Sequence, residues 1–219
     1  MGKLYNFLNR FFKKSPKVSS EIIKRSNSIE KKSISIISNN CLAGVIYHDY
    51  GLKFESPVIN CFISWLDFPF FIMHLKDYLE VEIKENKIEN RRYPVGVLEL
   101  SRKINVYFNH DKKFILAKNK WEERKKRVNF DNILVIVDTF GKKLSNDYIN
   151  ELLEISKKYK LLCLYSIKEN GVLPYDFFVK CELYEKKYYD SGKICQYKYF
   201  SGKRYYEDYL NANMIFENN

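Results

Sequence analysis

The feature that most constrains the fold is a run of consecutive apolar residues, NILVIVD, at residues 132–138. A run without polar alternation is typical of a strand in a parallel sheet whose two faces are both covered. A similar run at 34–38 precedes a predicted helix, and another, LLCLYS at 161–166, follows one. Because strand, helix and strand alternate, the sequence predicts an α/β fold of three layers, with helices flanking a mixed or mainly parallel sheet.

Local signals assign most of the remaining chain. Gly51 is a helix stop, Pro57 disfavours helix in the residue before it, and Ser64 with Asp67 resembles a capping box. The resulting predictions are a helix at 42–50, an extended segment at 56–64, a helix from Ser64 to about residue 80, a charged loop at 84–92, a turn at 93–96, a strand at 103–110, a helix at 111–128, a helix capped by Ser145, and two short hairpins in a Tyr-rich tail from residue 183 on.

The first 32 residues differ from the rest. Leu4, Phe7 and Phe11 recur at helical spacing among lysines, which predicts a basic amphipathic helix at residues 3–14 that either contacts a membrane surface or packs on protein. The stretch 15–32 is polar, which predicts a linker or a loose helix. We expect an α/β domain at 33–219, either as one unit or as two small subdomains, 33–130 and 131–219.

Charge and cysteine content limit the classes of function. The net charge of +11 favours an anionic partner, such as a sugar phosphate or an anionic membrane surface. Nucleic acid is not the expected partner, because the chain has no zinc finger or RNP-like signature and its charge is spread along its length. The five cysteines are odd in number and contain no CxxC pair, which predicts free thiols in the cytoplasm and no metal site. Nothing in the sequence indicates an oligomeric state.

The candidate site follows the first predicted strand. Asn39, Asn40 and Cys41 stand where this strand gives way to a helix, and ligands of open α/β sheets bind beyond the carboxyl ends of the strands. Free N–H groups and the helix dipole there favour an anion, and they would lower the pKa of a cysteine thiol. One interpretation is a substrate cradle in an open cleft with Cys41 as nucleophile. The other is an Asn helix cap followed by a small buried thiol.

Histidines are the candidate general bases for Cys41. His48 lies two turns along the same predicted helix, roughly 10 Å away, so a direct contact is disfavoured. His110 begins the long predicted helix at 111–128. Asp138 ends a central strand and is placed to face a crevice, while Arg124 and Arg127 belong to a basic run that is either a solvated face or an anion contact.

Three segments together resemble a bacterial family of domains of unknown function, often labelled exopolysaccharide (capsule) biosynthesis protein. They are SIISNNCLAGVIYHDYGLKFESPVIN, the YPVG turn, and FNHDKKFILAKNKWEERKKRVNFDNILVIV, and they cover most of residues 33–140. Many members have a glycine pair where this chain has Ala43-Gly44. The recurrent positions of that family correspond here to Asn39, Asn40, Cys41, Gly44, Ser56, Pro57, Asn60, Tyr93, Pro94, Gly96, His110, Trp121, Arg124, Arg127 and Asn132.

The resemblance implies a two-part α/β fold and a role in assembling surface polysaccharide. We therefore expect a transferase at the cytoplasmic membrane face, with acyl transfer ahead of glycosyl or phosphoryl transfer, and acyl-coenzyme A or a nucleotide sugar as donor. A non-catalytic ligand-binding or scaffold subunit is the alternative. The expected catalytic residues are Cys41, His110 and His48, and the expected substrate contacts are Asn39, Asn40, Gly44, Ser56, Asn60, Arg124, Arg127 and Asp138.

Overall fold

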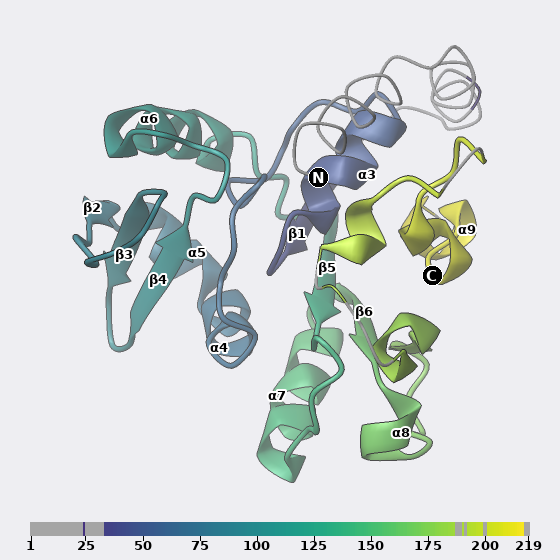
Figure 1. Cartoon of the computed structure of the whole chain (residues 1–219). Helices are drawn as coiled ribbons and strands as arrows, with labels where there is room; N and C mark the ends of the chain where they lie inside the picture. Colours follow the sequence, from purple (N-terminus) through teal and green to yellow (C-terminus); the bar gives the residue numbers. More distant parts are fainter. Residues whose placement is uncertain (1–23, 25–32, 187–189, 191, 199–200, 217–219) are drawn as a thin grey trace.

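A computed structural model describes residue 24 and residues 33–186, 190, 192–198 and 201–216. Two sheets organise the chain, and they lie side by side in Figure 1. The larger sheet has four parallel strands in the order β1-β5-β6-β7, and the smaller has three antiparallel strands in the order β2-β3-β4. The prediction of an α/β fold with a mainly parallel sheet is confirmed. The strands of the parallel sheet are β1 (Ser35–Ser38), β5 (Ile133–Asp138), β6 (Lys160–Tyr165) and β7 (Phe178–Lys180).

Alternate side chains of the parallel strands point into two separate hydrophobic cores. Ile37, Val135 and Val137 point into one core, whereas Ile36 and Ile136 point into the other, as the two-residue repeat of a strand requires. The first core is covered by α7 (Asn146–Ser156) and the antiparallel sheet, and the second by α3 (Leu42–Asp49) and the C-terminal tail. All six residues of β5 are buried, which explains the uninterrupted apolar run.

The antiparallel sheet belongs to a long segment placed between β1 and β5. After α3, the chain forms α4 (Phe68–Met73), α5 (Leu75–Glu80), β2 (Lys84–Glu85), β3 (Val95–Glu99), β4 (Lys103–Tyr107) and α6 (Phe114–Lys125) before it returns to β5. Buried Leu98, Ile104 and Val106 join the sheet to the first core. Trp121 of α6 is 1% exposed and packs edge-on against Phe108.

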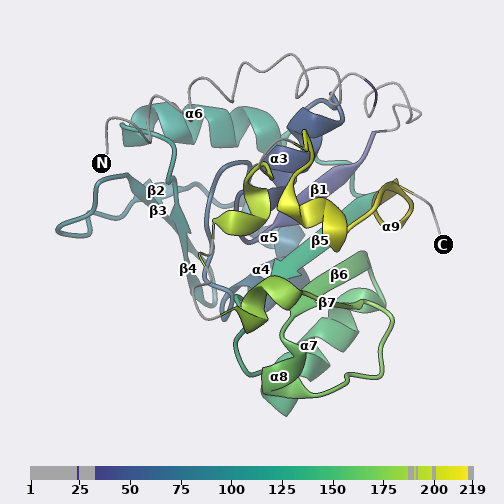
Figure 2. The ribbon, with the colours of Figure 1, turned by 45° about the vertical axis from the view of Figure 1, so that its right-hand side comes forward.

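The tail winds over α3 and the parallel sheet, as Figure 2 shows. Between β6 and β7 lies α8 (Ile167–Asn170), which is not part of the tail. The described elements of the tail are the 3-10 helices η1 (Glu182–Glu185), η2 (Lys193–Cys195) and η3 (Tyr205–Asp208), and α9 (Ala212–Phe216). One antiparallel bridge joins Tyr197 to Arg204. In the described part of the tail the expected pair of hairpins is therefore reduced to this single bridge, and helical turns replace the rest.

Three local predictions are wrong in whole or in part. In the segment expected to be extended at 56–64, residues 57–60 form a turn instead, with Asn60 at a φ of 60°, whereas Phe62 forms an antiparallel bridge with Tyr107. The helix expected from Ser64 to residue 80 is broken at His74 into α4 and α5. In the YPVG segment expected to turn at 93–96, Val95 and Gly96 are instead the first residues of β3. Gly96 lies against Ile83 and Phe108, where a Cβ would approach Ile83 to 2.5 Å. The predicted amphipathic helix at 3–14 and linker at 15–32 lie outside the described residues, apart from residue 24.

Candidate functional site

The structure brings Cys41 and His110 together from two different sheets. Cys41 follows β1, His110 follows β4, and the Cys41 Sγ lies 3.2 Å from the His110 Nε2. His110 is exposed and Cys41 is partly exposed. His110 precedes α6 in a turn rather than beginning the helix, so its ring is not part of the regular helix face. The result is a thiol and an imidazole in hydrogen-bond contact near the surface.

Asn39 and Asn40 are joined to Asp138 at the end of the neighbouring strand. The Asn39 amide donates to the Asp138 carbonyl at 2.9 Å and accepts the Asp138 N–H at 2.8 Å, and the Asn40 amide donates to the Asp138 carboxylate at 2.8 Å. Asn39 is fully buried and Asn40 is 8% exposed. The open cleft expected around these two side chains is therefore wrong, and they tie β1 to β5 directly beneath Cys41.

The side chains of Asn40 and Ser38 cap the N-terminus of α3. The Asn40 Oδ1 accepts the Leu42 N–H and the Ser38 Oγ accepts the Ala43 N–H, both at 2.9 Å. The Asn40 contact expected in the second interpretation is thus present, whereas its buried thiol is not, because Cys41 is partly exposed. These two N–H groups are not free to hold an anion. The Cys41 side chain makes no capping bond, and burial raises its pKa to about 11. The expected lowering of this pKa is wrong, because loss of water around the thiol outweighs the helix dipole.

Asp138 is the charged centre of the buried network. Its carboxylate accepts the Tyr184 hydroxyl at 2.5 Å and the Phe140 N–H at 2.8 Å, in addition to the Asn40 amide. Burial raises the pKa of Asp138 to about 6, and the three hydrogen bonds oppose that rise. Asp138 therefore faces protein donors at the end of β5 and fixes the position of Asn40.

The turn at 57–60 packs closely on α3. A Cβ added at Gly44 would lie 2.6 Å from the Asn60 Oδ1, so glycine is needed for this approach. Asn60 is half-buried, and its predicted role as a substrate contact stays a prediction. Ser56 is fully buried and its hydroxyl has no hydrogen-bond partner among the described residues, so it does not face the pair's surface.

Arg124 of α6 and Arg127, which follows the end of α6, contact this turn and the segment before it. Arg124 donates to the Ile59 carbonyl at 3.2 Å and lies over the Phe54 ring, while Arg127 donates to the Phe54 carbonyl at 3.4 Å. Burial lowers the pKa of Arg124. These contacts attach the segment 54–59 to α6, and the anion contact predicted for both side chains stays a prediction.

His48 is not brought to the thiol. Its side chain is 60% exposed in the last turn of α3, and its Nδ1 lies 3.2 Å from the carboxylate of the neighbouring Asp49. Asp49 is buried and also accepts from Arg204 at 2.7 Å. Of the two histidines predicted as bases, the structure therefore pairs only His110 with Cys41.

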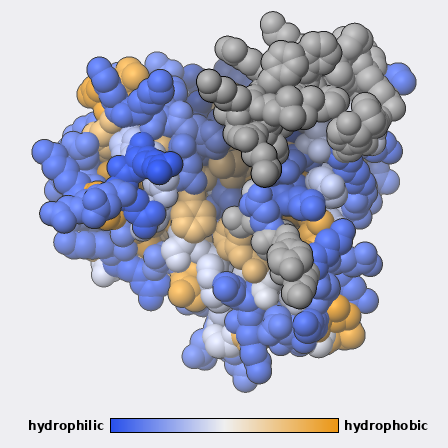
Figure 3. Space-filling model, viewed as in Figure 1, coloured by the Kyte–Doolittle hydropathy of each residue, from blue (hydrophilic) through white to orange (hydrophobic). Residues whose placement is uncertain are grey.

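A row of four aromatic rings was not predicted. Tyr93, Tyr107, Phe62 and Phe140 follow one another with centroid separations of 6.5, 5.6 and 5.9 Å, and all four are half-buried. We call these four rings the aromatic row. Figure 3 shows apolar side chains in a hollow between the antiparallel sheet and the parallel sheet. The available signal was the alternation in β4, which directs Tyr107 away from the core that receives Val106.

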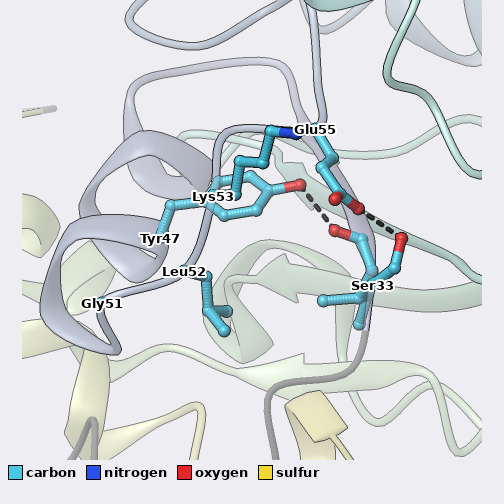
Figure 4. Close-up of a pocket in the computed structure, with 7 residues that line it drawn as sticks. Ser33, Tyr47, Gly51, Leu52, Lys53 and Glu55 are labelled. Atoms are coloured by element: carbon cyan, nitrogen blue, oxygen red, sulfur yellow. Dashed lines mark hydrogen bonds between the residues drawn. The ribbon is translucent and has the colours of Figure 1, made fainter.

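A pocket of about 310 Å³ lies elsewhere, at the amino end of β1. Ser33, Tyr47, Lys53 and Glu55 help to line it, as shown in Figure 4. The Tyr47 hydroxyl donates to the Ile34 carbonyl at 2.7 Å, and the Ser33 hydroxyl donates to Glu55 at 2.6 Å. The predicted site residues do not line this pocket, because they follow the opposite end of the strand.

Three further properties concern the described residues as a whole. Nowhere in them do three His, Cys, Asp or Glu side chains gather as a metal site requires. No helix in the same part of the chain has both the length and the apolar character needed to cross a membrane. All five cysteines are free thiols.

Comparison of the sequence with known proteins assigns the chain to a family. An uncharacterized protein of Haemophilus influenzae (strain ATCC 51907 / DSM 11121 / KW20 / Rd) is 26% identical over 182 residues, which cover 83% of each chain. The model of the domain of unknown function DUF1919 matches residues 12–215 and so includes both sheets, Cys41 and His110. The chain therefore belongs to the DUF1919 family.

Proposed function

We propose that the protein is an acyltransferase that uses Cys41 as nucleophile and His110 as general base. The observation that carries the proposal is the 3.2 Å contact between the Cys41 Sγ and the His110 Nε2 across 69 residues of sequence. A nucleophile within hydrogen-bond reach of a base is the arrangement that covalent catalysis requires. Because burial keeps Cys41 largely protonated at neutral pH, the thiol needs an adjacent base to react.

The proposed reaction has two steps, acylation of Cys41 and transfer of the acyl group to an acceptor. His110 Nε2 takes the Cys41 Sγ proton as the sulfur attacks the carbonyl of an acyl thioester, and the imidazolium then protonates the departing thiol, which leaves an acyl-Cys41 thioester. An acceptor hydroxyl next gives its proton to His110 and attacks that thioester. The Cys41 sulfur departs and recovers the proton from His110. General base catalysis of this kind contributes about 10²–10⁴-fold to the rate.

The substrate assignment rests on the resemblance of residues 33–140 to proteins labelled for exopolysaccharide biosynthesis. We propose a surface-polysaccharide precursor as acceptor and acyl-coenzyme A as donor, with the protein at the cytoplasmic membrane face. The net charge of +11 supports an anionic partner, such as a lipid-linked sugar phosphate. Peripheral contact through residues 3–14 remains part of this proposal.

The experiment is acylation of the purified protein by acetyl-coenzyme A, followed by intact-mass and peptide mass spectrometry. We expect one acetyl group on Cys41, removable by hydroxylamine, that is absent in Cys41→Ser and formed about 100-fold more slowly in His110→Gln. Cys195→Ser is the matched control, since Cys195 is also a partly exposed thiol. Absence of acetyl-Cys41, or equal labelling of His110→Gln, would contradict the assigned roles.

A ligand-binding or scaffold subunit is the second candidate. It is favoured by the raised pKa of Cys41, because a protonated thiol hydrogen-bonded to His110 also serves simply to join the two sheets. In that case neither Cys41→Ser nor His110→Gln changes the product of polysaccharide assembly in cells, while both variants lower the thermal stability of the protein.

A further inference from the structure

The outer face of α6 exposes two neighbouring aliphatic side chains. Ile115 is 58% exposed and Leu116 is 52% exposed. Among the exposed large apolar residues of the described chain, they alone are adjacent in sequence. Figure 3 shows apolar atoms among hydrophilic ones over α6, which lies at the outer edge of the molecule in Figure 1. An apolar pair this open is a candidate contact surface.

The opposite face of α6 fixes this orientation. Ala117 and Trp121 are each 1% exposed and belong to the first core. Because a helix turns by about 100° per residue, Ile115 and Leu116 lie on either side of the direction opposite to Trp121. The aliphatic pair is therefore presented by a helix that is already folded and docked, and a partner gains the contact without having to order the helix.

Lysines flank the aliphatic pair along the chain. Two stand directly before the helix, one lies within it and one follows its last residue, and all four are exposed. One of the four is paired with Asp111, and the other three have no acidic partner among the described residues. The only exposed acidic residue of α6 is Glu123, which is paired with Arg127 at 3.5 Å. The outer face is therefore positively charged at neutral pH. The four lysines are Lys112, Lys113, Lys120 and Lys126.

This combination of charge and apolar surface favours one class of partner. A stable contact between two proteins buries about 800 Å² on each side, of which two aliphatic side chains supply only a small part. A second copy of the chain seated face to face would bring two sets of lysines together, and these would repel each other. Nucleic acid would attract the lysines but offers nothing apolar to the pair. An anionic bilayer takes both, since lysines bind its headgroups and aliphatic side chains enter below them.

We propose that Ile115, Leu116 and the four lysines around them, together the α6 patch, bind the surface of an anionic lipid bilayer. The aliphatic pair enters the boundary between headgroups and acyl chains, and the ammonium groups stay level with the lipid phosphates. A bilayer accepts a convex face, so the contact needs no groove. The α6 patch is separate from the contact proposed for residues 3–14, and it does not depend on acyl transfer. His110 stands two residues before Lys112, so binding brings the segment that carries His110 to the membrane surface.

The test is flotation of the full-length chain with vesicles made of equal parts of phosphatidylglycerol and phosphatidylcholine, and with vesicles of phosphatidylcholine alone. We expect binding to the anionic vesicles only, strong at about 0.1 M salt and weak at about 1 M. Ile115→Gln/Leu116→Gln should weaken binding about tenfold, because the apolar contact is lost while glutamine keeps the helix. Lys112→Gln/Lys113→Gln should weaken it about 25-fold, since each lysine near an anionic surface contributes about fivefold.

Matched variants elsewhere on the surface are the controls. Leu66→Gln/Val172→Gln removes two other exposed aliphatic side chains, which are 57% and 76% exposed. Lys142→Gln/Lys143→Gln removes another adjacent pair of exposed lysines. Both controls should bind like wild type. As a gain of binding, Leu116→Trp should float more strongly and show blue-shifted tryptophan emission on the vesicles, because tryptophan favours the membrane interface.

Several results would overturn the proposal. They are failure of the wild type to float with anionic vesicles, binding of the α6 variants equal to wild type, and an equal loss in the α6 and control variants, which would assign binding to diffuse charge. Tighter binding to a DNA duplex than to the vesicles, or a dimer that Ile115→Gln/Leu116→Gln dissociates, would identify a different partner. Acetyl-Cys41 formation by a protein that does not float contradicts only this inference, whereas flotation without acetylation contradicts only the acyltransferase.

Discussion

Exchanging the side chains of Asn40 and Asp138 tests the polarity of the network beneath Cys41. In Asp138→Asn, the new amide keeps its oxygen toward the Phe140 N–H and therefore presents an N–H group to the Asn40 Nδ2, where the present contact is 2.8 Å. Asn40 cannot relieve this clash by turning over its amide, because its Oδ1 accepts the Leu42 N–H. In Asn40→Asp, two carboxylates face each other instead. The exchange Asn40→Asp/Asp138→Asn restores one donor and one acceptor, and its carboxylate still caps Leu42.

The magnitude follows from burial. Each single variant leaves a buried polar group without a partner, which costs about 2 kcal/mol, so independent effects would sum to about 4 kcal/mol. We expect the exchange to cost about 1 kcal/mol, which is a coupling of about 3 kcal/mol between the two positions. Urea denaturation followed by circular dichroism measures all four proteins. Asn105→Asp is the matched control, because it retains the acceptor for Asn86 and should change little. A coupling below about 0.5 kcal/mol would refute this account.

The same Asp138→Asn variant isolates the contribution of one carboxyl group to pH dependence. The folded protein holds the Asp138 proton up to a pKa of about 6, whereas the unfolded chain releases it near 3.8. The folded state therefore binds more protons between these values, so the stability contributed by Asp138 falls as pH rises through this window, by about 3 kcal/mol. The free energy of unfolding of wild type minus that of Asp138→Asn should fall from pH 4 to 6 and then level off. A difference that increases with pH would show the opposite linkage.

Three further predictions concern packing, charge and the thiol. Gly44→Ala should destabilise the protein by about 1–3 kcal/mol, and Asn60→Gly should rescue it in the double variant; thermal denaturation checks both, and no rescue would contradict the close contact. Arg204→Met should cost about 3–5 kcal/mol in urea denaturation, because it breaks the ion pair of fully buried Asp49; a loss below 1 kcal/mol would argue against that pair. The rate of Cys41 alkylation by iodoacetamide should rise about tenfold per pH unit from pH 7 to 10, whereas a plateau near neutral pH would show a stable thiolate.

Local patterns predicted the elements better than the site. The apolar runs of β1 and β5, the Gly51 stop and the Ser145 cap are determined by neighbouring residues, and the structure contains each of them. The pairing of Cys41 with His110 depends on how the antiparallel sheet docks on β1, which no periodicity encodes. The direction of the Cys41 pKa shift was missed for a related reason. The helix dipole can be inferred from sequence, whereas the burial that outweighs it is a property of the tertiary fold.

The long segment of chain between β1 and β5 affects the order in which the strands pair during folding. Pairing Leu134 with Lys160 closes a loop of about 26 residues, whereas pairing Ser35 with Ile133 closes one of about 98, at an extra entropic cost of roughly 1 kcal/mol. Native pairs that close short loops form early, so β5 and β6 associate first and β1 joins afterwards. We therefore expect a full-length chain that refolds from denaturant to form its thiol–imidazole contact late, after the pairing of β5 with β6.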